Sequence, residues 1–271
     1  MYTEYWKLKD TPFQNVLDIK YLYKSQEFEE TYSRLKYCIE GRRGGAILVG
    51  GYGTGKSTLC KALVKELKSS SQYLPIFISY PFFSSSEVLK EIFIQISNNN
   101  VPSNIGNLEL IRLIEKQLLL KTEEKNLHTV IIIDEAHLIN DIEVFEQLRM
   151  LLNFQNEENF LITLIFVGQE PLIEKMNQVK QLKQRLAIRY ILNCLRKEEV
   201  EGYIKFRLSV AGRTDEIFDS SAIEKIISYS KCIPREINNI CDMALFIGFA
   251  RKAEKINAEI IEEAYKELEI F

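Results

Sequence analysis

The sequence of 271 residues lacks three features that would each place it in a special class of protein. No stretch approaches the roughly 20 consecutive apolar residues of a membrane-spanning helix. The N-terminus, which reads Met1-Tyr2-Thr3-Glu4-Tyr5-Trp6-Lys7, has no signal-peptide pattern. No two cysteines have the CxxC spacing that is typical of zinc sites and redox motifs. We therefore expect a cytoplasmic protein with no membrane span.

An excess of basic residues is also missing. The chain contains 35 Lys and Arg against 38 Asp and Glu, a formal net charge of −3. This balance argues against a strongly basic nucleic-acid-binding protein, although it leaves room for a local basic patch. The cysteines lie inside apolar helix or strand patterns, and we expect reduced, buried thiols at Cys38, Cys60, Cys194, Cys232 and Cys241.

Hydrophobic residues make up 46% of the chain and charged residues 27%, which is typical of a globular protein with a sizeable core. Short apolar runs predict strands at residues 46–49, 74–80, 129–133, 160–167 and 189–192. Amphipathic patterns predict helices at residues 26–40, 58–67, 86–97, 108–121, 142–153 and 172–185. Beyond these, only helices are predicted, at residues 197–211, 219–230, 234–250 and 257–269.

Strands that alternate with helices, followed by helices alone, predict an α/β fold. We expect a five-stranded parallel sheet sandwiched by helices, and then a small helical domain. The predicted parts are an N-terminal aromatic segment at 1–25, an α/β domain at 26–194 and a helical domain at 195–271.

One stretch carries a specific chemical signature: Gly50-Gly51-Tyr52-Gly53-Thr54-Gly55-Lys56-Ser57, followed by Thr58. It fits the phosphate-binding loop pattern, and it lies between a predicted strand and a predicted helix. Glycines let the backbone turn its N–H groups toward phosphate oxygens, and the helix N-terminus adds positive potential. The lysine reaches the β- and γ-phosphates and the serine hydroxyl ligates Mg²⁺. The stretch therefore predicts binding of ATP and Mg²⁺.

Two acids, Asp134 and Glu135, directly follow the third predicted strand. Ligands of parallel α/β sheets bind at the carboxyl ends of strands, which puts this pair beside the phosphate loop. We expect Asp134 to hold Mg²⁺ and Glu135 to polarise the water that attacks the γ-phosphate. A solvated turn is the alternative interpretation. The letters Asp134-Glu135-Ala136-His137 also spell a helicase box, but the chain is too short for two helicase motor domains.

Taken together, these motifs make the chain similar to AAA+ ATPases, and more narrowly to the ExeA/GspA group named from the general secretion pathway. The stretches that carry the resemblance are Tyr5-Trp6-Lys7-Leu8 with Pro12-Phe13, Leu148–Asn153, Val167-Gly168-Gln169, Gln184-Arg185 and Ile233–Asn238. The resemblance implies a P-loop NTPase fold with a C-terminal helical lid. The chain departs from the group's pattern at Gly51, at Glu170-Pro171 and at Cys232.

The resemblance also implies roles for residues outside the two motifs. Gln169 corresponds to a polar sensor of the γ-phosphate and the attacking water. Arg185 corresponds to an arginine finger that reaches the neighbouring subunit's nucleotide, with Arg189 as the alternative. Arg235 corresponds to the second sensor, an arginine of the lid that touches the same nucleotide.

The N-terminal aromatic segment is implied to lie near the adenine. Stacking of the base on Tyr21 or Tyr23 and plain core packing of these rings are both compatible with the sequence.

We thus expect an oligomeric, Mg²⁺-dependent ATPase that assembles a partner complex of the secretion or cell-envelope type. Secretion members of the group carry a membrane span and a wall-binding domain, and this sequence shows neither. The alternative is a soluble transposition ATPase of the TniB/TnsC type, which binds DNA with ATP and recruits a transposase. Candidate DNA contacts for that alternative are Lys175, Lys180 and Lys183.

Overall fold

The structure is a computed structural model that describes residues 2–79, 84–101, 105–157 and 159–270. The chain forms two compact units. One, which we call the α/β unit, comprises Glu30–Gly51 and Leu59–Leu192. The other, which we call the helical unit, comprises Met1–Glu29, Tyr52–Thr58 and Asn193–Phe271. Each is described by itself below.

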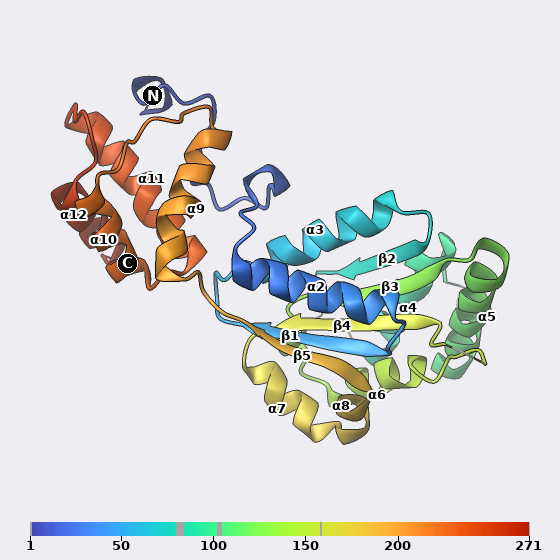
Figure 1. The fold of residues 1–271 in the computed structure, drawn as a ribbon. Helices are drawn as coiled ribbons and strands as arrows, with labels where there is room; N and C mark the ends of the chain where they lie inside the picture. The colour runs from blue at the N-terminus through green and yellow to red at the C-terminus, as the bar shows by residue number, and fades with distance from the viewer. Residues whose placement is uncertain (1, 80–83, 102–104, 158, 271) are drawn as a thin grey trace. The chain divides into compact units, whose positions relative to one another are not determined.

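The α/β unit is built on one five-stranded sheet in the order β2-β3-β4-β1-β5, with every neighbouring pair parallel (Figure 1). The strands are β1 Gly45–Gly50, β2 Tyr73–Ile78, β3 His128–Ile133, β4 Ile162–Gly168 and β5 Leu186–Leu192. All residues of β1, β3 and β4 are buried, as expected for central parallel strands that are covered on both faces. Their runs of Ile, Val and Leu are the residue types that pack on such a surface.

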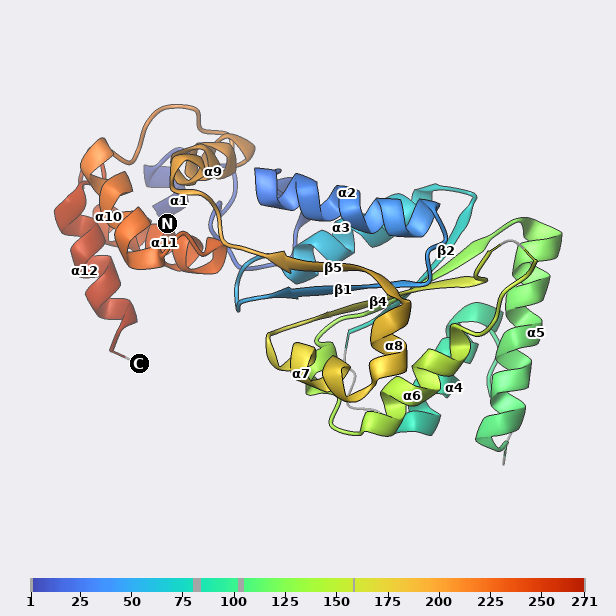
Figure 2. The same ribbon diagram turned by 60° about the horizontal axis from the view of Figure 1, so that its bottom comes forward.

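Helices cover both faces of this sheet (Figure 2). They are α2 Gln26–Glu40, α3 Lys56–Ser69, α4 Ser85–Ser97, α5 Asn107–Lys125, α6 Ile142–Leu151, α7 Pro171–Gln178 and α8 Lys180–Arg185. On one face lie α2 and α3; on the other lie α4, α6, α7 and α8. The larger core joins the second group and α5 to the sheet, with Phe145 and Phe166 fully buried in contact. A short 3₁₀ helix, η2 Ala136–Leu138, follows β3.

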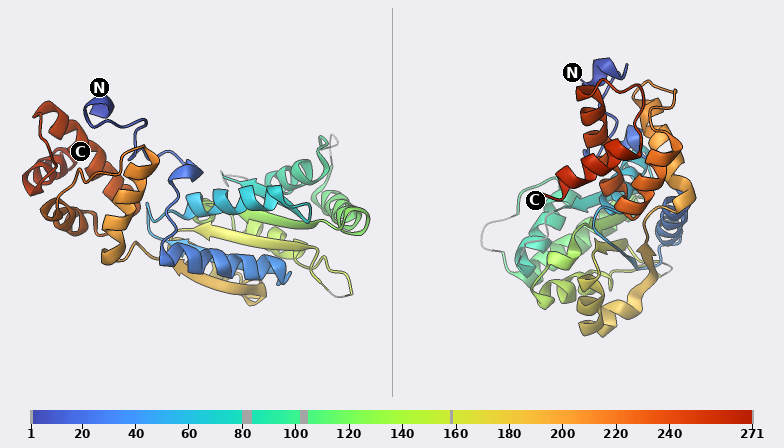
Figure 3. Two further views of the ribbon diagram at one scale, coloured as in Figure 1. Left: turned by 45° about the horizontal axis from the view of Figure 1, so that its top comes forward. Right: turned by 90° about the vertical axis from the view of Figure 1, so that its left-hand side faces the viewer.

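The helical unit has its own core. Its elements are α1 Tyr2–Tyr5, η1 Ile19–Tyr21, α9 Lys197–Val210, α10 Ser220–Ser230, α11 Pro234–Ala250 and α12 Ala258–Leu268. The N-terminal segment lies against these helices (Figure 3). Trp6 is buried and its Nε1–H donates to the Leu245 carbonyl oxygen at 2.9 Å. Phe13 is buried edge-on against Phe218. The N-terminal aromatics therefore contribute to the core of the C-terminal helices.

The sequence-based fold class is confirmed, with three corrections at the boundaries of elements. The fourth strand begins at Ile162, because Phe160 instead forms an antiparallel bridge with Gln155. The predicted helix 172–185 is divided at Val179, whose φ of −106° and ψ of 69° are not helical. The fifth strand begins three residues earlier than predicted, at Leu186. The predicted strand 74–80 ends on residue 80, which lies outside the described residues.

Two other expectations concern the whole chain. No helix in the ranges that the structure describes is long and apolar enough to cross a membrane. The cysteines are free thiols, and four of them are buried; Cys194 is partly exposed.

A histidine buried at the start of β3 makes stability depend on pH. His128 is 1% exposed, and its Nε2 lies 2.8 Å from the Thr163 hydroxyl oxygen. Burial, with a smaller contribution from the charge of Arg42, lowers the pKa of His128 to about 3. The unfolded chain takes up a proton near pH 6.5 while the folded chain does not. Stability contributed by the neutral ring is therefore lost as the pH falls below about 6.5.

We predict that acidification from about pH 7 to about pH 5 destabilises the protein through His128 by about 2 kcal/mol. A His128→Gln variant lacks this titration, so its free energy of unfolding will fall by that much less over the same interval. Urea denaturation of both proteins at the two pH values measures the difference. Equal losses in the two proteins would contradict the assignment.

Candidate functional site

Two candidate residues and the start of the glycine loop lie at one edge of the sheet because of strand register. Val49 of β1 pairs with Gly168 of β4, and Ile133 of β3 pairs with Phe166 of β4. The residues that follow these strands, among them Asp134 and Gln169, therefore leave the sheet at the same carboxyl edge as the loop after β1 (Figure 1). This edge is where ligands of parallel α/β sheets bind.

The loop between β1 and α3 has the backbone of a phosphate cradle. Gly53 and Gly55 have φ of +76° and +99°, a region that L side chains rarely adopt. A Cβ atom at Gly55 would meet no atom within 4 Å, so the loop borders open space there. Helix α3 begins at Lys56, which is buried, and its N-terminal end points its positive potential at this space. The loop thus fits a phosphate group.

Asp134 suits a magnesium site. The residue is 4% exposed, and its Oδ1 accepts a hydrogen bond from the Glu135 N–H at 2.9 Å. Within the part of the chain that the structure describes, no three His, Cys, Asp or Glu side chains gather as a metal centre. A Mg²⁺ ion that is bound to nucleotide needs only one or two protein ligands. Asp134 and Ser57 remain the candidates for that role.

Glu135 is held in an uncommon backbone conformation. Its φ of 52° and ψ of 32° are left-handed, which is infrequent for a residue other than glycine and concentrates at functional sites. Its Oε2 lies 3.3 Å from Nδ1 of His137. A Cβ atom at Gly168 would come within 3.1 Å of the His137 nitrogen, so the glycine lets η2 approach the end of β4. The contact between His137 and Glu135 was not predicted, because His137 was considered only as part of the helicase box.

Arg235 contacts the phosphate loop. It is the second residue of α11, after Pro234, and its N–H donates to the Gly53 carbonyl oxygen at 3.4 Å. Its guanidinium carbon lies 4.2 Å from the ring centroid of Tyr52. A Cβ atom at Gly53 would come within 2.8 Å of the Arg235 Cβ, so this contact requires glycine. The predicted second sensor is thereby brought to the nucleotide loop.

Arg185 and Arg189 are not brought to that edge. Leu186, the residue after Arg185, pairs with Gly45, the first residue of β1. Arg185 is therefore at the amino edge of the sheet, and its Nη1 donates to the Leu152 carbonyl oxygen at 2.8 Å. Arg189 is exposed, and its Nη2 donates to the Lys183 carbonyl oxygen at 2.6 Å. Arg189 pairs with Ile47, in the middle of β1.

The two candidate adenine contacts pack within the helical unit. Tyr21 is 8% exposed, and the guanidinium carbon of Arg207 lies 4.9 Å from its ring centroid. Tyr23 is edge-on to Tyr203, with ring centroids 5.7 Å apart. This geometry favours the core-packing alternative, and the stacking of adenine on these rings stays a prediction.

Of the three lysines considered for DNA, two already make hydrogen bonds. Lys175 Nζ donates to the carbonyl oxygens of His137 and Ile139, and so ties α7 to η2. Lys183 Nζ donates to the Asn177 side chain. Lys180 is exposed. The hydrogen bonds of Lys175 could not be predicted from the sequence, because they depend on tertiary contact.

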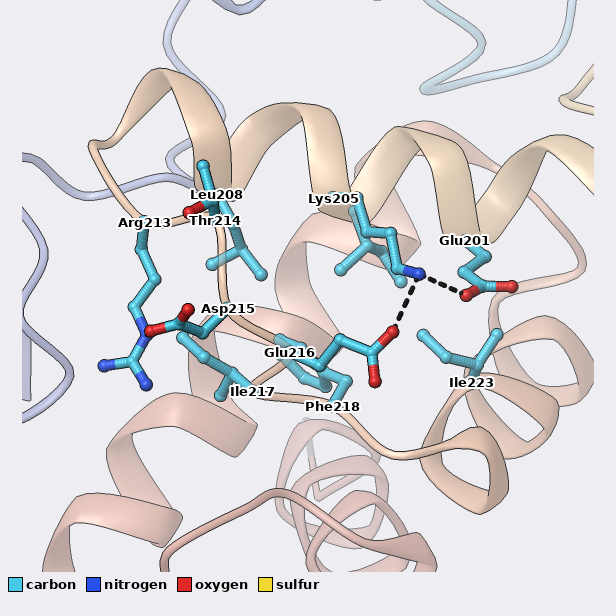
Figure 4. A pocket seen from close by; sticks show the side chains of 11 residues that line it. Glu201, Lys205, Leu208, Arg213, Thr214, Asp215, Glu216, Ile217, Phe218 and Ile223 are labelled. Atoms are coloured by element: carbon cyan, nitrogen blue, oxygen red, sulfur yellow. Dashed lines mark hydrogen bonds and ion pairs between the residues drawn. The ribbon is translucent and has the colours of Figure 1, made fainter.

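A hollow in the helical unit belongs to a different region. Lys205 lies at its rim and bridges Glu201 at 2.7 Å and Glu216 at 3.0 Å (Figure 4). None of the predicted site residues lines it. This hollow is therefore separate from the predicted site residues.

The chain is similar in sequence to proteins of a known family. Residues 39–176, about half of the chain, match the family described as AAA domain. Over 98% of the chain, the sequence is 33% identical to general secretion pathway protein A of Aeromonas hydrophila. The chain spans about half the length of that relative, 48%.

Solved structures share the fold. Aeropyrum pernix ORC2 in its ADPNP–ADP complexes matches with a TM-score of 0.67 at 16% identity, over 96% of this chain and 72% of that chain. Cdc6p of Pyrobaculum aerophilum matches with a TM-score of 0.70 at 14% identity, over 95% of this chain and 70% of that chain. At these identities the likeness concerns the fold alone, which is the AAA+ fold with a helical part after the sheet.

The contacts of Lys175 predict an effect on stability. A Lys175→Met variant leaves the carbonyl oxygens of His137 and Ile139 without this donor, and we expect a loss of about 1–3 kcal/mol. Lys180→Met, at an exposed position five residues away, is the matched control and should change the free energy of unfolding by less than about 0.5 kcal/mol. Urea denaturation compares the two. Equal effects would show that Lys175 does not tie α7 to η2.

Proposed function

The chain belongs to the AAA domain family, and on that footing we propose that it is a Mg²⁺-dependent ATPase whose active site is completed by a neighbouring copy. The observation that carries the proposal is the shared edge of the sheet. Asp134 and Glu135 follow β3 at the edge where β1 enters the glycine loop. A phosphate cradle and a pair of acids at one edge are the parts that ATP hydrolysis requires.

In this proposal, each group acts by its charge and position. Loop N–H groups and Lys56 bind the β- and γ-phosphates, while Ser57 and Asp134 hold Mg²⁺. The ion, when bound, neutralises charge on the phosphate oxygens. Glu135 accepts a proton from the attacking water, and Gln169 orients that water. The approach of His137 to Glu135 restricts where the carboxylate can point.

Arg235 supplies a second cationic contact to the nucleotide. Its side chain already lies over the loop that is to hold the phosphates. A guanidinium presents several N–H donors in one plane, which suits the oxygens of a terminal phosphate. This supports its assignment as the lid arginine that touches the nucleotide.

The need for a neighbouring copy rests on where Arg185 lies. β1 has six residues, which separates the two edges of the sheet by about 17 Å. An arginine at the amino edge is out of reach of the nucleotide that its own loop holds, but it is free to approach a nucleotide on another copy. Arginine fingers of this kind raise the hydrolysis rate by about 10³–10⁵. On assembly, the Arg185 side chain would give up its hydrogen bond to the Leu152 carbonyl oxygen and donate instead to a phosphate oxygen of the neighbouring copy's nucleotide.

The partner complex is proposed from similarity. The relative at 33% identity is named for the general secretion pathway, and we assign this chain to the same broad role: using its ATPase cycle to assemble a secretion or cell-envelope complex. Binding of DNA in the manner of a transposition ATPase is the alternative that the sequence left open. No observation favours it, because Lys175 and Lys183 already bond within the α/β unit.

Two substitutions separate binding from hydrolysis. Lys56→Ala removes the main cationic partner of the β- and γ-phosphates, and it should abolish ATP binding. Glu135→Gln keeps binding but loses the proton acceptor, and turnover should fall about 10²–10⁴-fold. ATP at a hundred times its Kd should stabilise wild type and Glu135→Gln by about 2.7 kcal/mol, and leave Lys56→Ala unchanged.

Titration calorimetry, thermal unfolding with and without ATP, and phosphate-release assays make these measurements. Normal turnover by Glu135→Gln would remove this residue from the role of proton acceptor. Unchanged ATP affinity in Lys56→Ala would contradict the phosphate-binding loop itself.

Substitution of Arg185 tests the shared site. Arg185→Ala should bind ATP as wild type does and hydrolyse it poorly, because each finger acts on a neighbour's nucleotide. A mixture of Arg185→Ala and Lys56→Ala proteins should recover turnover, since each copy supplies the part that the other lacks. Arg189→Ala, four residues along the chain, tests the alternative finger in the same assays. Turnover per protomer that stays constant over a wide dilution series of wild type would refute the shared site.

A further inference from the structure

Tyr52 is unusual among the residues of the phosphate loop. Its neighbours in the loop are glycine, threonine, lysine and serine, whereas it carries a large aromatic ring that is 63% exposed. The guanidinium of Arg235 covers that ring, at 4.2 Å from its centroid. No role in phosphate binding follows from the loop pattern for a side chain at this position.

The contact uses only one part of the guanidinium. Stacking on an aromatic ring engages the flat face of the group, which leaves the N–H donors at its edge able to bond elsewhere. Within the described residues, the Arg235 side chain has no hydrogen bond and no ion pair, and the ring of Tyr52 is its one specific contact. A stacked guanidinium with open donors is prepared to bind an anion.

The base of the same side chain is also restrained. The Arg235 N–H donates to the Gly53 carbonyl oxygen, and the Arg235 Cβ packs where a Cβ of Gly53 would otherwise lie. The backbone thus anchors one end of the arginine on the loop, and Tyr52 holds the other end. An unrestrained arginine would lose more rotamer entropy on binding phosphate.

We propose that Tyr52 is a positioning residue that holds the Arg235 guanidinium over the phosphate loop, so that its N–H edge meets the terminal phosphate of a nucleoside triphosphate. The inference rests on the proposed ATPase function and deepens it. The γ-phosphate, which is the terminal phosphate of a triphosphate, is absent from a diphosphate. Tyr52 therefore contributes to the preference for triphosphate over diphosphate. The helical unit, which carries Arg235, is thereby sensitive to which nucleotide the loop holds.

A double-mutant cycle with Tyr52→Leu and Arg235→Ala tests this inference. Leucine has an apolar side chain but no aromatic face, so the stacking is lost. Affinity for an ATP analogue with a non-hydrolysable β–γ bridge should fall about 2- to 30-fold in Tyr52→Leu, the range expected for one cation–π contact. In an Arg235→Ala background, the same substitution should cause no further loss. Tyr52→Phe, which keeps the aromatic face, should restore the affinity.

Affinity for ADP is the internal control. It should be nearly the same in wild type and Tyr52→Leu, which would show that the loop still folds and still binds the inner phosphates. Calorimetry measures both ligands on each variant. An equal loss of affinity for ADP, or a loss that persists without Arg235, overturns the positioning role while leaving the ATPase proposal intact. A wild-type protein that binds no ATP analogue overturns both.

Discussion

Parallel pairing of β3, β4 and β1 is the constraint on which the rest of the site depends. It brings the carboxyl ends of the three strands to one edge, so that Asp134, Gln169 and the glycine loop begin from neighbouring points. The same register sends Arg185, which precedes β5, to the opposite edge. In the proposed function, this separation is the reason why a second copy is needed to supply the arginine finger.

Contact between the loop and α11 adds a second constraint. Gly53 is needed twice: for its positive φ, and for the close approach of Arg235. Tyr52 and Gly53 of the loop thus contact Arg235 within the helical unit.

Much of the fold and part of the site could be predicted from the sequence, because they depend on local patterns. Short apolar runs predicted the existence of all five strands, and the glycine loop and the Asp134-Glu135 pair are recognisable as local motifs. The contacts of Lys175 with His137 and Ile139 could not be predicted, because they join residues more than 35 positions apart. The stacking of Arg235 on Tyr52 was missed for the same reason. The break at Val179 is a local change of backbone that an amphipathic pattern does not encode.

The central claim is that one edge of the sheet holds the nucleotide and that a neighbouring copy completes the site. An experimental structure of the protein with Mg²⁺ and a non-hydrolysable ATP analogue tests it most directly. The account predicts the triphosphate in the loop Gly50–Ser57, with the metal between Ser57 and Asp134, and Arg185 of an adjacent copy at the terminal phosphate. A nucleotide bound elsewhere, or an assembly in which Arg185 faces no nucleotide, would contradict it.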